Sequence, residues 1–131
     1  ESTRNTTVIN TLIIDNIGIL SRLYQYANIT YVGGGFGDSG LHNILEAAVY
    51  GKPVFFFFLY QRHFEAVEME EAGGAISIEN ALELENELNK LWNDDTLLKE
   101  RGDSAKQYVY ANAGATGRIL DYIYKNLLLT N

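Results

Sequence analysis

The sequence predicts an α/β protein with a Rossmann-like, three-layer αβα fold around a small parallel sheet of about four strands. Short apolar runs rich in β-branched and aromatic residues alternate with segments of helical spacing along the 131 residues. The run Val54–Leu59 is apolar at every position, as expected for a strand that is covered on both faces. Strands separated by helices indicate βαβ units with right-handed crossovers. Residues 1–131 are therefore expected to form a single domain.

The first part of the chain is expected to hold two strands and one helix. In order, the elements are a disordered lead-in at residues 1–8, a strand at Val8–Ile14, a helix at Ile17–Ala27 and a strand at Ile29–Val32. Asp15 and Asn16 offer side-chain oxygens that could cap this helix. Its residues Leu20, Leu23 and Tyr24 share an apolar stripe that predicts burial against the sheet.

The second part alternates in the same way and then becomes helical. The expected elements are helices near Leu41–Val49 and Gln61–Glu71, strands at Val54–Leu59 and Ala75–Ile78, and helices at Leu82–Trp92, Asp95–Tyr110 and Thr116–Leu128. Gly73 and Gly74 are typical of a helix end, and Asn80 and Asp94 are typical N-caps. The acidic residues Glu65, Glu68, Glu70 and Glu71 are expected to form a solvated helix face.

Composition excludes several classes of function. The net charge of −7 argues against nucleic-acid binding through a basic patch. The chain contains no cysteine, so it can form neither disulfides nor thiolate metal sites, and it fits a reducing, cytoplasmic compartment. No apolar run reaches the length of a membrane span, and residues 1–10 do not resemble a signal peptide. No residue spacing predicts a metal site, and no cofactor is expected.

A glycine-rich loop after the second predicted strand is the strongest functional signal. It contains Gly33, Gly34, Gly35, Gly37 and Gly40. The last three have the spacing of a dinucleotide fingerprint between a strand and a helix. The loop nevertheless follows the second strand rather than the first, and the next strand offers no acidic residue for a ribose. A phosphate-binding loop and a tightly packed glycine turn both remain open.

Polar residues at the start of the following helix form the second signal. His42, Asn43 and Glu46 lie within one turn of each other, near the positive end of the helix dipole. A carboxylate there could accept hydrogen bonds from ribose hydroxyls, and the Asn43 amide could donate and accept. A solvated polar face is the alternative interpretation. Gly18 could supply further backbone N–H groups at a strand end, or it could simply belong to a helix-capping turn.

Several segments together resemble one enzyme family. They are Tyr26–Phe36, His42–Ala48, Gly51–Val54, Ala72–Ala75 and Asn112–Arg118, within a match from about residue 10 to the end. Each piece alone is unspecific. The combination resembles the C-terminal domain of the 3-deoxy-D-manno-octulosonic acid (Kdo) transferases, which are GT-B glycosyltransferases.

The resemblance implies that this part of the enzyme holds the CMP moiety of the donor CMP-Kdo. The acceptor would be a lipid A precursor at the cytoplasmic face of the bacterial inner membrane, bound through an N-terminal domain that also carries the catalytic base. We therefore expect no catalytic residue in this chain, no activity from it alone, and membrane association only for the full-length parent. The nucleotide-binding residues expected are Ile17, Gly18, Ile19, Gly33, Gly34, Gly35, Gly37, Gly40, His42, Asn43, Ile44, Leu45 and Glu46. The alternatives are a GT-B transferase that uses a UDP- or GDP-sugar, or a non-catalytic α/β interaction module.

Overall fold

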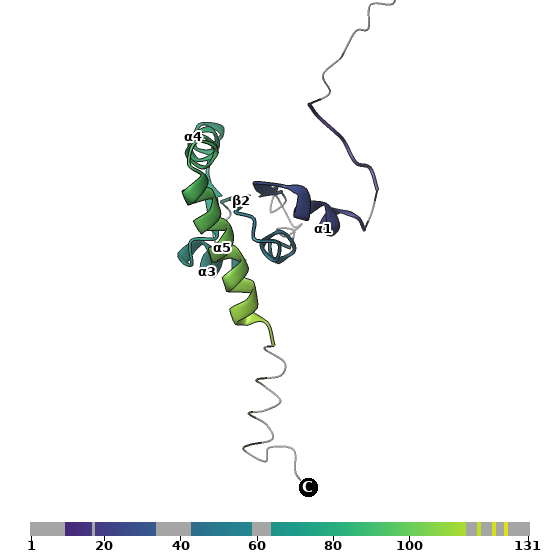
Figure 1. Cartoon of the computed structure of the whole chain (residues 1–131), viewed down its shortest axis with the longest axis vertical. Coiled ribbons are helices and arrows are strands. Elements are labelled where there is room, and N and C mark those ends of the chain that lie inside the picture. The colour runs from purple at the N-terminus through teal and green to yellow at the C-terminus, as the bar shows by residue number, and fades with distance from the viewer. Residues whose placement is uncertain are drawn as a thin grey trace, which may run out of the picture.

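The computed structural model describes residues 10–16, 18–33, 43–58 and 64–114, together with Arg118, Tyr122 and Lys125 (Figure 1). In chain order the helices and strands are α1 (Leu20–Leu23), the 3-10 helix η1 (Tyr24–Tyr26), β1 (Thr30–Val32), α2 (Leu45–Ala48), β2 (Val54–Phe57), α3 (Phe64–Glu71), β3 (Ala75–Ile78), α4 (Ala81–Trp92) and α5 (Asp95–Asn112). The α/β class is confirmed.

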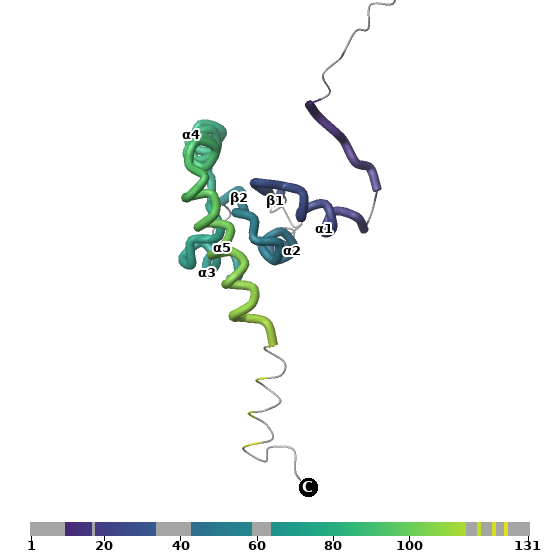
Figure 2. The backbone as a smooth tube through the Cα atoms, in the orientation of Figure 1, coloured from purple at the N-terminus to yellow at the C-terminus, as the bar shows by residue number. Residues whose placement is uncertain are grey.

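The sheet has three parallel strands in the order β1-β2-β3. About four strands were predicted, and the prediction of a strand at Val8–Ile14 is wrong for residues 10–14, which form neither helix nor strand. Leu12 and Ile13 are 80% and 87% exposed, and the segment runs away from β1 (Figure 2). Apolar, β-branched composition favours a strand only where a neighbour supplies the hydrogen-bond ladder and covers the side chains. Val8 and Ile9 lie outside the described residues.

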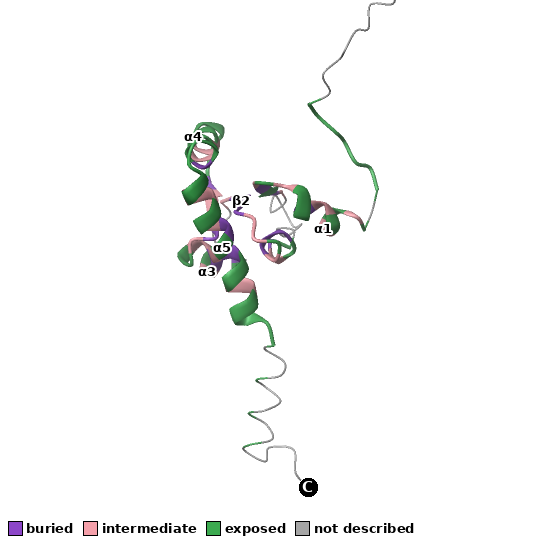
Figure 3. Ribbon diagram, in the orientation of Figure 1, coloured by how far each residue is buried: buried purple, intermediate pink, exposed green. Residues whose placement is uncertain are grey.

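Helices cover both faces of the sheet, which confirms the three-layer arrangement. We call one face the α2 face, because Val32, Val54, Phe56 and Ala75 pack there with Tyr24 of η1 and with residues of α2, α3 and α5. We call the other the α4 face, because Phe55, Ile76 and Ile78 pack there with α4 and the first turn of α5. The buried residues concentrate at the sheet between these layers (Figure 3).

The predicted caps of α4 and α5 are confirmed. The Glu83 backbone N–H donates to Asn80 Oδ1 at 2.9 Å, and the Leu97 N–H donates to Asp94 Oδ1 at 2.9 Å. The predicted end of α3 is also confirmed, since Gly73 has φ +87 and its N–H donates to the Glu70 carbonyl. These side-chain and glycine signals are local, so the sequence alone reveals them.

The first predicted helix is shorter than expected. α1 begins at Leu20 rather than Ile17, tightens into η1, and ends at Tyr26. Neither Asp15 nor Asn16 caps it, because Gly18 has φ +93, a conformation that no right-handed helix contains. The predicted burial of the apolar stripe is confirmed for Tyr24, which is 9% exposed within the core, and it is wrong for Leu20, which is 54% exposed.

The other helices differ from their predicted bounds mainly at their ends. α2 begins at Leu45 and α3 at Phe64, and the predicted first turns, at 41–42 and 61–63, lie outside the described residues. α5 extends to Asn112, and Gly114 with φ +78 marks the predicted break after it. Of the last predicted helix, Arg118, Tyr122 and Lys125 are described, and all three are helical.

α5 holds the layers together by unusually close packing on two glycines. A Cβ at Gly102 would lie 2.2 Å from the Gly51 carbonyl oxygen, and a Cβ at Gly74 would lie 2.4 Å from the backbone of Ala105. Gly51 belongs to the turn from α2 into β2, where the Thr30 hydroxyl also donates to the Pro53 carbonyl at 2.9 Å. α5 therefore packs directly against the turn that joins α2 to β2.

Candidate functional site

The carboxyl ends of β1, β2 and β3 lie at one edge of the sheet, because the three strands are parallel. We call this the carboxyl edge. Gly33 directly follows β1 there, and α2 begins on the connection that leads from β1 back to β2. Ligands of open α/β sheets bind outside this edge. The parallel sheet therefore places Gly33 and the start of α2 where a ligand would be expected.

Asn43 and Glu46 stand exposed at the start of α2. The Leu45 backbone N–H donates to Asn43 Oδ1 at 3.0 Å, so the amide oxygen of Asn43 stabilises the first turn of the helix. This hydrogen bond occupies an acceptor of Asn43 and leaves its Nδ2 hydrogens for other partners. Glu46 lies in the first turn of α2, where its negative charge is favourable to the helix dipole.

Glu46 also faces η1. The pKa of the Tyr24 hydroxyl is raised above its usual value, first by burial and then by the negative charge of Glu46. The two side chains are therefore electrostatic neighbours across the contact between η1 and α2. Sequence reasoning placed Tyr24 in an apolar stripe, but it could not reveal this pairing, which depends on how two separate helices meet.

Ile44 and Leu45 play different parts from their polar neighbours. Ile44 is 4% exposed and belongs to the core on the α2 face, and Leu45 is half-buried against it. Their side chains hold α2 on the sheet. Their carbonyls accept the Ala48 and Val49 backbone N–H groups within the helix.

Two predicted glycines can be described. Gly18 is exposed, and its φ of +93 is one that residues with a Cβ adopt only under strain. A Cβ at Gly33 would meet only the Tyr31 ring, at 3.9 Å, so close packing does not require a glycine there. Ile19 is half-buried just before α1. The other predicted site residues, Ile17, Gly34, Gly35, Gly37, Gly40 and His42, lie outside the described residues.

A cavity of about 410 Å³ adjoins the start of α2 and was not predicted. Its walls come from α2, α3 and α5, and they include Leu45, Phe64, Glu65, Glu68 and Tyr108. Its apolar floor continues the core, and its polar groups include two carboxylates. A phosphate would be repelled by these carboxylates, so this cavity does not suit the charged part of a nucleotide.

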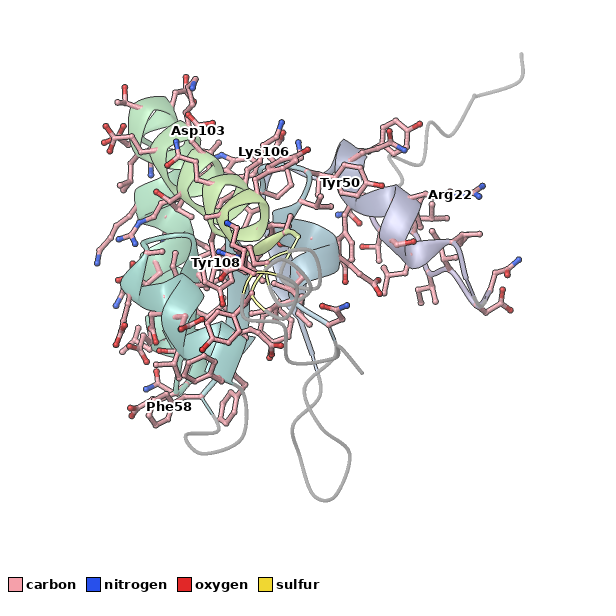
Figure 4. All side chains as sticks on the ribbon, turned by 90° about the horizontal axis from the view of Figure 1, so that it is seen from below. Arg22, Tyr50, Phe58, Asp103, Lys106 and Tyr108 are labelled. Carbon is pink, nitrogen blue, oxygen red and sulfur yellow. The ribbon has the colours of Figure 1, made fainter. Side chains whose placement is uncertain are left out.

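Tyr108, labelled in Figure 4, lines this cavity from α5. Its hydroxyl donates to Glu68 Oε2 at 2.7 Å. Burial, followed by the hydrogen bond and the charge of Glu68, raises the pKa of Tyr108 to about 12. The hydroxyl therefore remains protonated at neutral pH and acts as a structural tie between α3 and α5.

The expectation that the acidic residues of α3 form a purely solvated face is wrong for two of them. Glu68 accepts the Tyr108 bond, and Glu70 accepts the Ser77 backbone N–H at 3.1 Å, together with the Ser77 hydroxyl. Both side chains are half-buried. Their partners lie 40 and 7 residues away in the chain, so the helical spacing on which the expectation rested carried no sign of these contacts.

Neither a metal centre nor a membrane span emerges from the described part of the chain. Its Asp and Glu side chains come together nowhere in a group of three that could ligate a metal ion. The helices that the structure describes are too short or too polar to cross a bilayer.

Comparison with known proteins supplies the family. The chain is 33% identical over 81 residues, or 61% of its length, to a 3-deoxy-D-manno-octulosonic acid transferase of Aquifex aeolicus. It is 33% identical over 110 residues, or 75% of its length, to an enzyme of the same name from Chlamydia trachomatis. A bifunctional glycosyltransferase/methyltransferase of Fusobacterium nucleatum is 30% identical over 112 residues.

The matches cover most of this chain but a small part of each relative. The chain spans 23% of the Aquifex protein, 26% of the Chlamydia protein and 18% of the Fusobacterium protein. No family model matches the chain, and no solved structure matches it. The Aquifex and Chlamydia proteins nevertheless share the same name, and each is 33% identical to this chain over more than half of its length. The chain is thus a relative of the 3-deoxy-D-manno-octulosonic acid transferases, corresponding in length to a fragment of them.

Proposed function

We propose that this chain is the donor-nucleotide part of a Kdo transferase, and that it binds the CMP moiety of CMP-Kdo at the carboxyl edge of its sheet. The observation that carries the proposal is the exposed pair Asn43, just before α2, and Glu46, in the first turn of α2. The pair stands at the carboxyl edge of a chain that is related to named Kdo transferases. Glu46 would accept hydrogen bonds from the ribose hydroxyls, and Asn43 Nδ2 would donate to the nucleotide.

The backbone around Gly18 and Gly33 would receive the phosphate. Gly18 lies just before α1, and Gly33 directly follows β1. Neither has a side chain that would keep a ligand from the main chain. The acidic cavity beside α2 supports this assignment, because its carboxylates disfavour an anion on that side. The phosphate would therefore lie toward the glycines and the ribose toward Glu46.

The rest of the reaction belongs to the longer parent enzyme. We propose that the parent transfers Kdo to a lipid A precursor in lipopolysaccharide biosynthesis, at the cytoplasmic face of the inner membrane, with the catalytic base on its other, N-terminal domain. The catalytic step needs no cofactor or metal in this proposal. The chain by itself would bind CMP weakly and transfer nothing.

A nucleotide titration followed by amide chemical shifts tests this assignment. We expect CMP to shift the amides of Gly18, Gly33 and Asn43 through Glu46, and Glu46→Ala to weaken binding about tenfold, as the loss of charged hydrogen bonds implies. Glu85→Ala, an exposed carboxylate on α4, is the matched control and should bind like the wild type. Shifts centred on other residues, or equal affinity of Glu46→Ala and the wild type, would refute the assignment.

A different nucleotide specificity is the second candidate. The Fusobacterium relative is named only as a glycosyltransferase/methyltransferase, which leaves the transferred sugar open. Stronger shifts with UMP or GMP than with CMP, at the same residues, would favour a transferase that uses a UDP- or GDP-sugar. No response to any of the three nucleotides would favour a non-catalytic interaction module.

A further inference from the structure

The side chain of Tyr24 joins η1 to the start of α2. It is 9% exposed and belongs to the same buried cluster as Ile44, Ala47 and Ala48. η1 and α2 are adjacent in the fold, and both pack on the α2 face of the sheet. A ring enclosed by close-packed neighbours has little freedom to change its rotamer. The core therefore sets the position of the Tyr24 hydroxyl.

The hydroxyl of Tyr24 is not used to hold this core together. It forms no hydrogen bond with any residue that the structure describes, whereas a buried tyrosine hydroxyl usually has a partner. The charged group that acts on it is Glu46, whose negative charge adds to the effect of burial and raises the pKa of Tyr24. The hydroxyl therefore stays protonated at neutral pH, and it offers an uncommitted hydrogen-bond donor beside a carboxylate of the candidate site.

The Glu46 carboxylate has the freedom that the Tyr24 ring lacks. Glu46 is exposed in the first turn of α2, and within the described part of the chain it forms no ion pair. Several rotatable bonds separate its carboxylate from the backbone. Holding such a side chain in one rotamer for a ligand costs conformational entropy, and a fixed donor beside it lowers that cost before the ligand arrives.

We propose that Tyr24 is a positioning residue of the candidate site, whose hydroxyl donates a hydrogen bond to the Glu46 carboxylate and holds it ready for the ribose hydroxyls. This role rests on the proposed function, which assigns Glu46 to the donor ribose. One carboxylate can serve both partners, because its two oxygens together offer about four acceptor positions. The geometry of the site at the start of α2 is then set in part by η1, from within the core.

A titration of Tyr24 tests the pairing without any nucleotide. Its ionisation is followed by NMR, through the ring carbon that carries the hydroxyl. Glu46→Gln should lower the pKa of Tyr24, because it removes the negative charge and keeps the size of the side chain. Glu85→Gln, at an exposed position of α4, is the matched control and should leave the pKa of Tyr24 unchanged. The same pKa of Tyr24 in Glu46→Gln and in the wild type would overturn the proposal.

CMP binding tests the positioning role itself. Tyr24→Phe keeps the buried ring and removes only the hydroxyl, and it should weaken the binding of CMP about fivefold. In a chain that already carries Glu46→Ala, the same substitution should change the affinity by less than about twofold, because the group that Tyr24 holds is gone. Tyr26→Phe removes an exposed hydroxyl from the same 3-10 helix, and as the matched control it should bind CMP like the wild type.

The possible outcomes distinguish the positioning role from the proposed function. Unchanged circular dichroism of Tyr24→Phe verifies that its core is intact. Equal CMP affinity of Tyr24→Phe and the wild type would overturn the positioning role alone. The same loss of affinity with and without Glu46 would also overturn it, because a general disturbance of α2 does not depend on that carboxylate. If Glu46→Ala binds CMP like the wild type, the proposed function fails and the positioning role fails with it, whereas the titration of Tyr24 still decides the pairing.

Discussion

Replacing Gly102 by alanine tests how α5 holds the domain together. Alanine is favoured over glycine inside a helix by about 1 kcal/mol, so propensity alone predicts that Gly102→Ala stabilises α5. The structure predicts the opposite sign. The new Cβ would lie 2.2 Å from the Gly51 carbonyl oxygen, whereas ordinary contacts begin at 3.4 Å. The two backbones would have to separate by about 1 Å, and forced overpacking of this kind costs about 1–3 kcal/mol or more.

The net expectation is a loss of about 2 kcal/mol of unfolding free energy. Because Gly51 belongs to a backbone turn with φ +70, it cannot rotate away as a flexible side chain would. A loss of this size lowers the melting temperature by about 6–8 °C in a domain of this length. Urea unfolding followed by circular dichroism measures it. Asn86→Ala, at an exposed position of α4, is the control, and it should be neutral or stabilise by about 0.5 kcal/mol. A Gly102→Ala protein as stable as the wild type would refute the packing argument.

Three further substitutions test other contacts. Gly74→Ala should destabilise the fold by at least about 2 kcal/mol in urea unfolding, because its Cβ would lie 2.4 Å from the α5 backbone. Asp94→Ala should cost about 1 kcal/mol, because it removes the cap of α5, whereas Thr96→Ala in the same turn should cost little. The raised pKa of Tyr108 means that its stabilising effect is present below pH 10 and is lost as the pH approaches 12. The unfolding free energy of the wild type should therefore fall toward that of Tyr108→Phe over this range.

The contrary results are equally specific. A stable Gly74→Ala protein would mean that α5 packs less closely on β3 than the structure has it. Equal losses for Asp94→Ala and Thr96→Ala would show that helix propensity, rather than capping, matters at that turn. A difference between Tyr108→Phe and the wild type that stays constant from pH 9 to pH 12 would refute the hydrogen bond as the cause of the raised pKa.

The sequence predicted those parts of the fold that depend on local signals. Asn80 and Asp94 cap the starts of α4 and α5 with their own side chains, and Gly73 ends α3 through its backbone conformation. These three helix ends were therefore predicted correctly. The all-apolar run from Val54 predicted a strand covered on both faces, and the two clusters around β2 confirm it. These signals need no knowledge of distant residues.

Tertiary context decided the rest. Leu12 and Ile13 carry the composition of a strand, but no neighbour pairs with them in the described arrangement. Glycine spacing predicted a ligand loop at Gly33–Gly40 without indicating where its atoms lie, and Gly34 to Gly40 fall outside the described residues. The tie between Tyr108 and Glu68 joins residues 40 positions apart, so no local pattern announces it. The site prediction therefore depends on Asn43 and Glu46, whose exposure at the carboxyl edge the structure describes.

A transferase assay on the longer parent enzyme tests the central claim most directly. The measurement is kcat/KM for CMP-Kdo with Glu46→Ala beside the wild type, and with Glu85→Ala as the matched control. If Glu46 binds the donor ribose, the first substitution should lower kcat/KM at least about tenfold, which corresponds to about 1.4 kcal/mol, and the control should leave it unchanged. Equal kcat/KM for Glu46→Ala and the wild type would contradict a donor role for the start of α2.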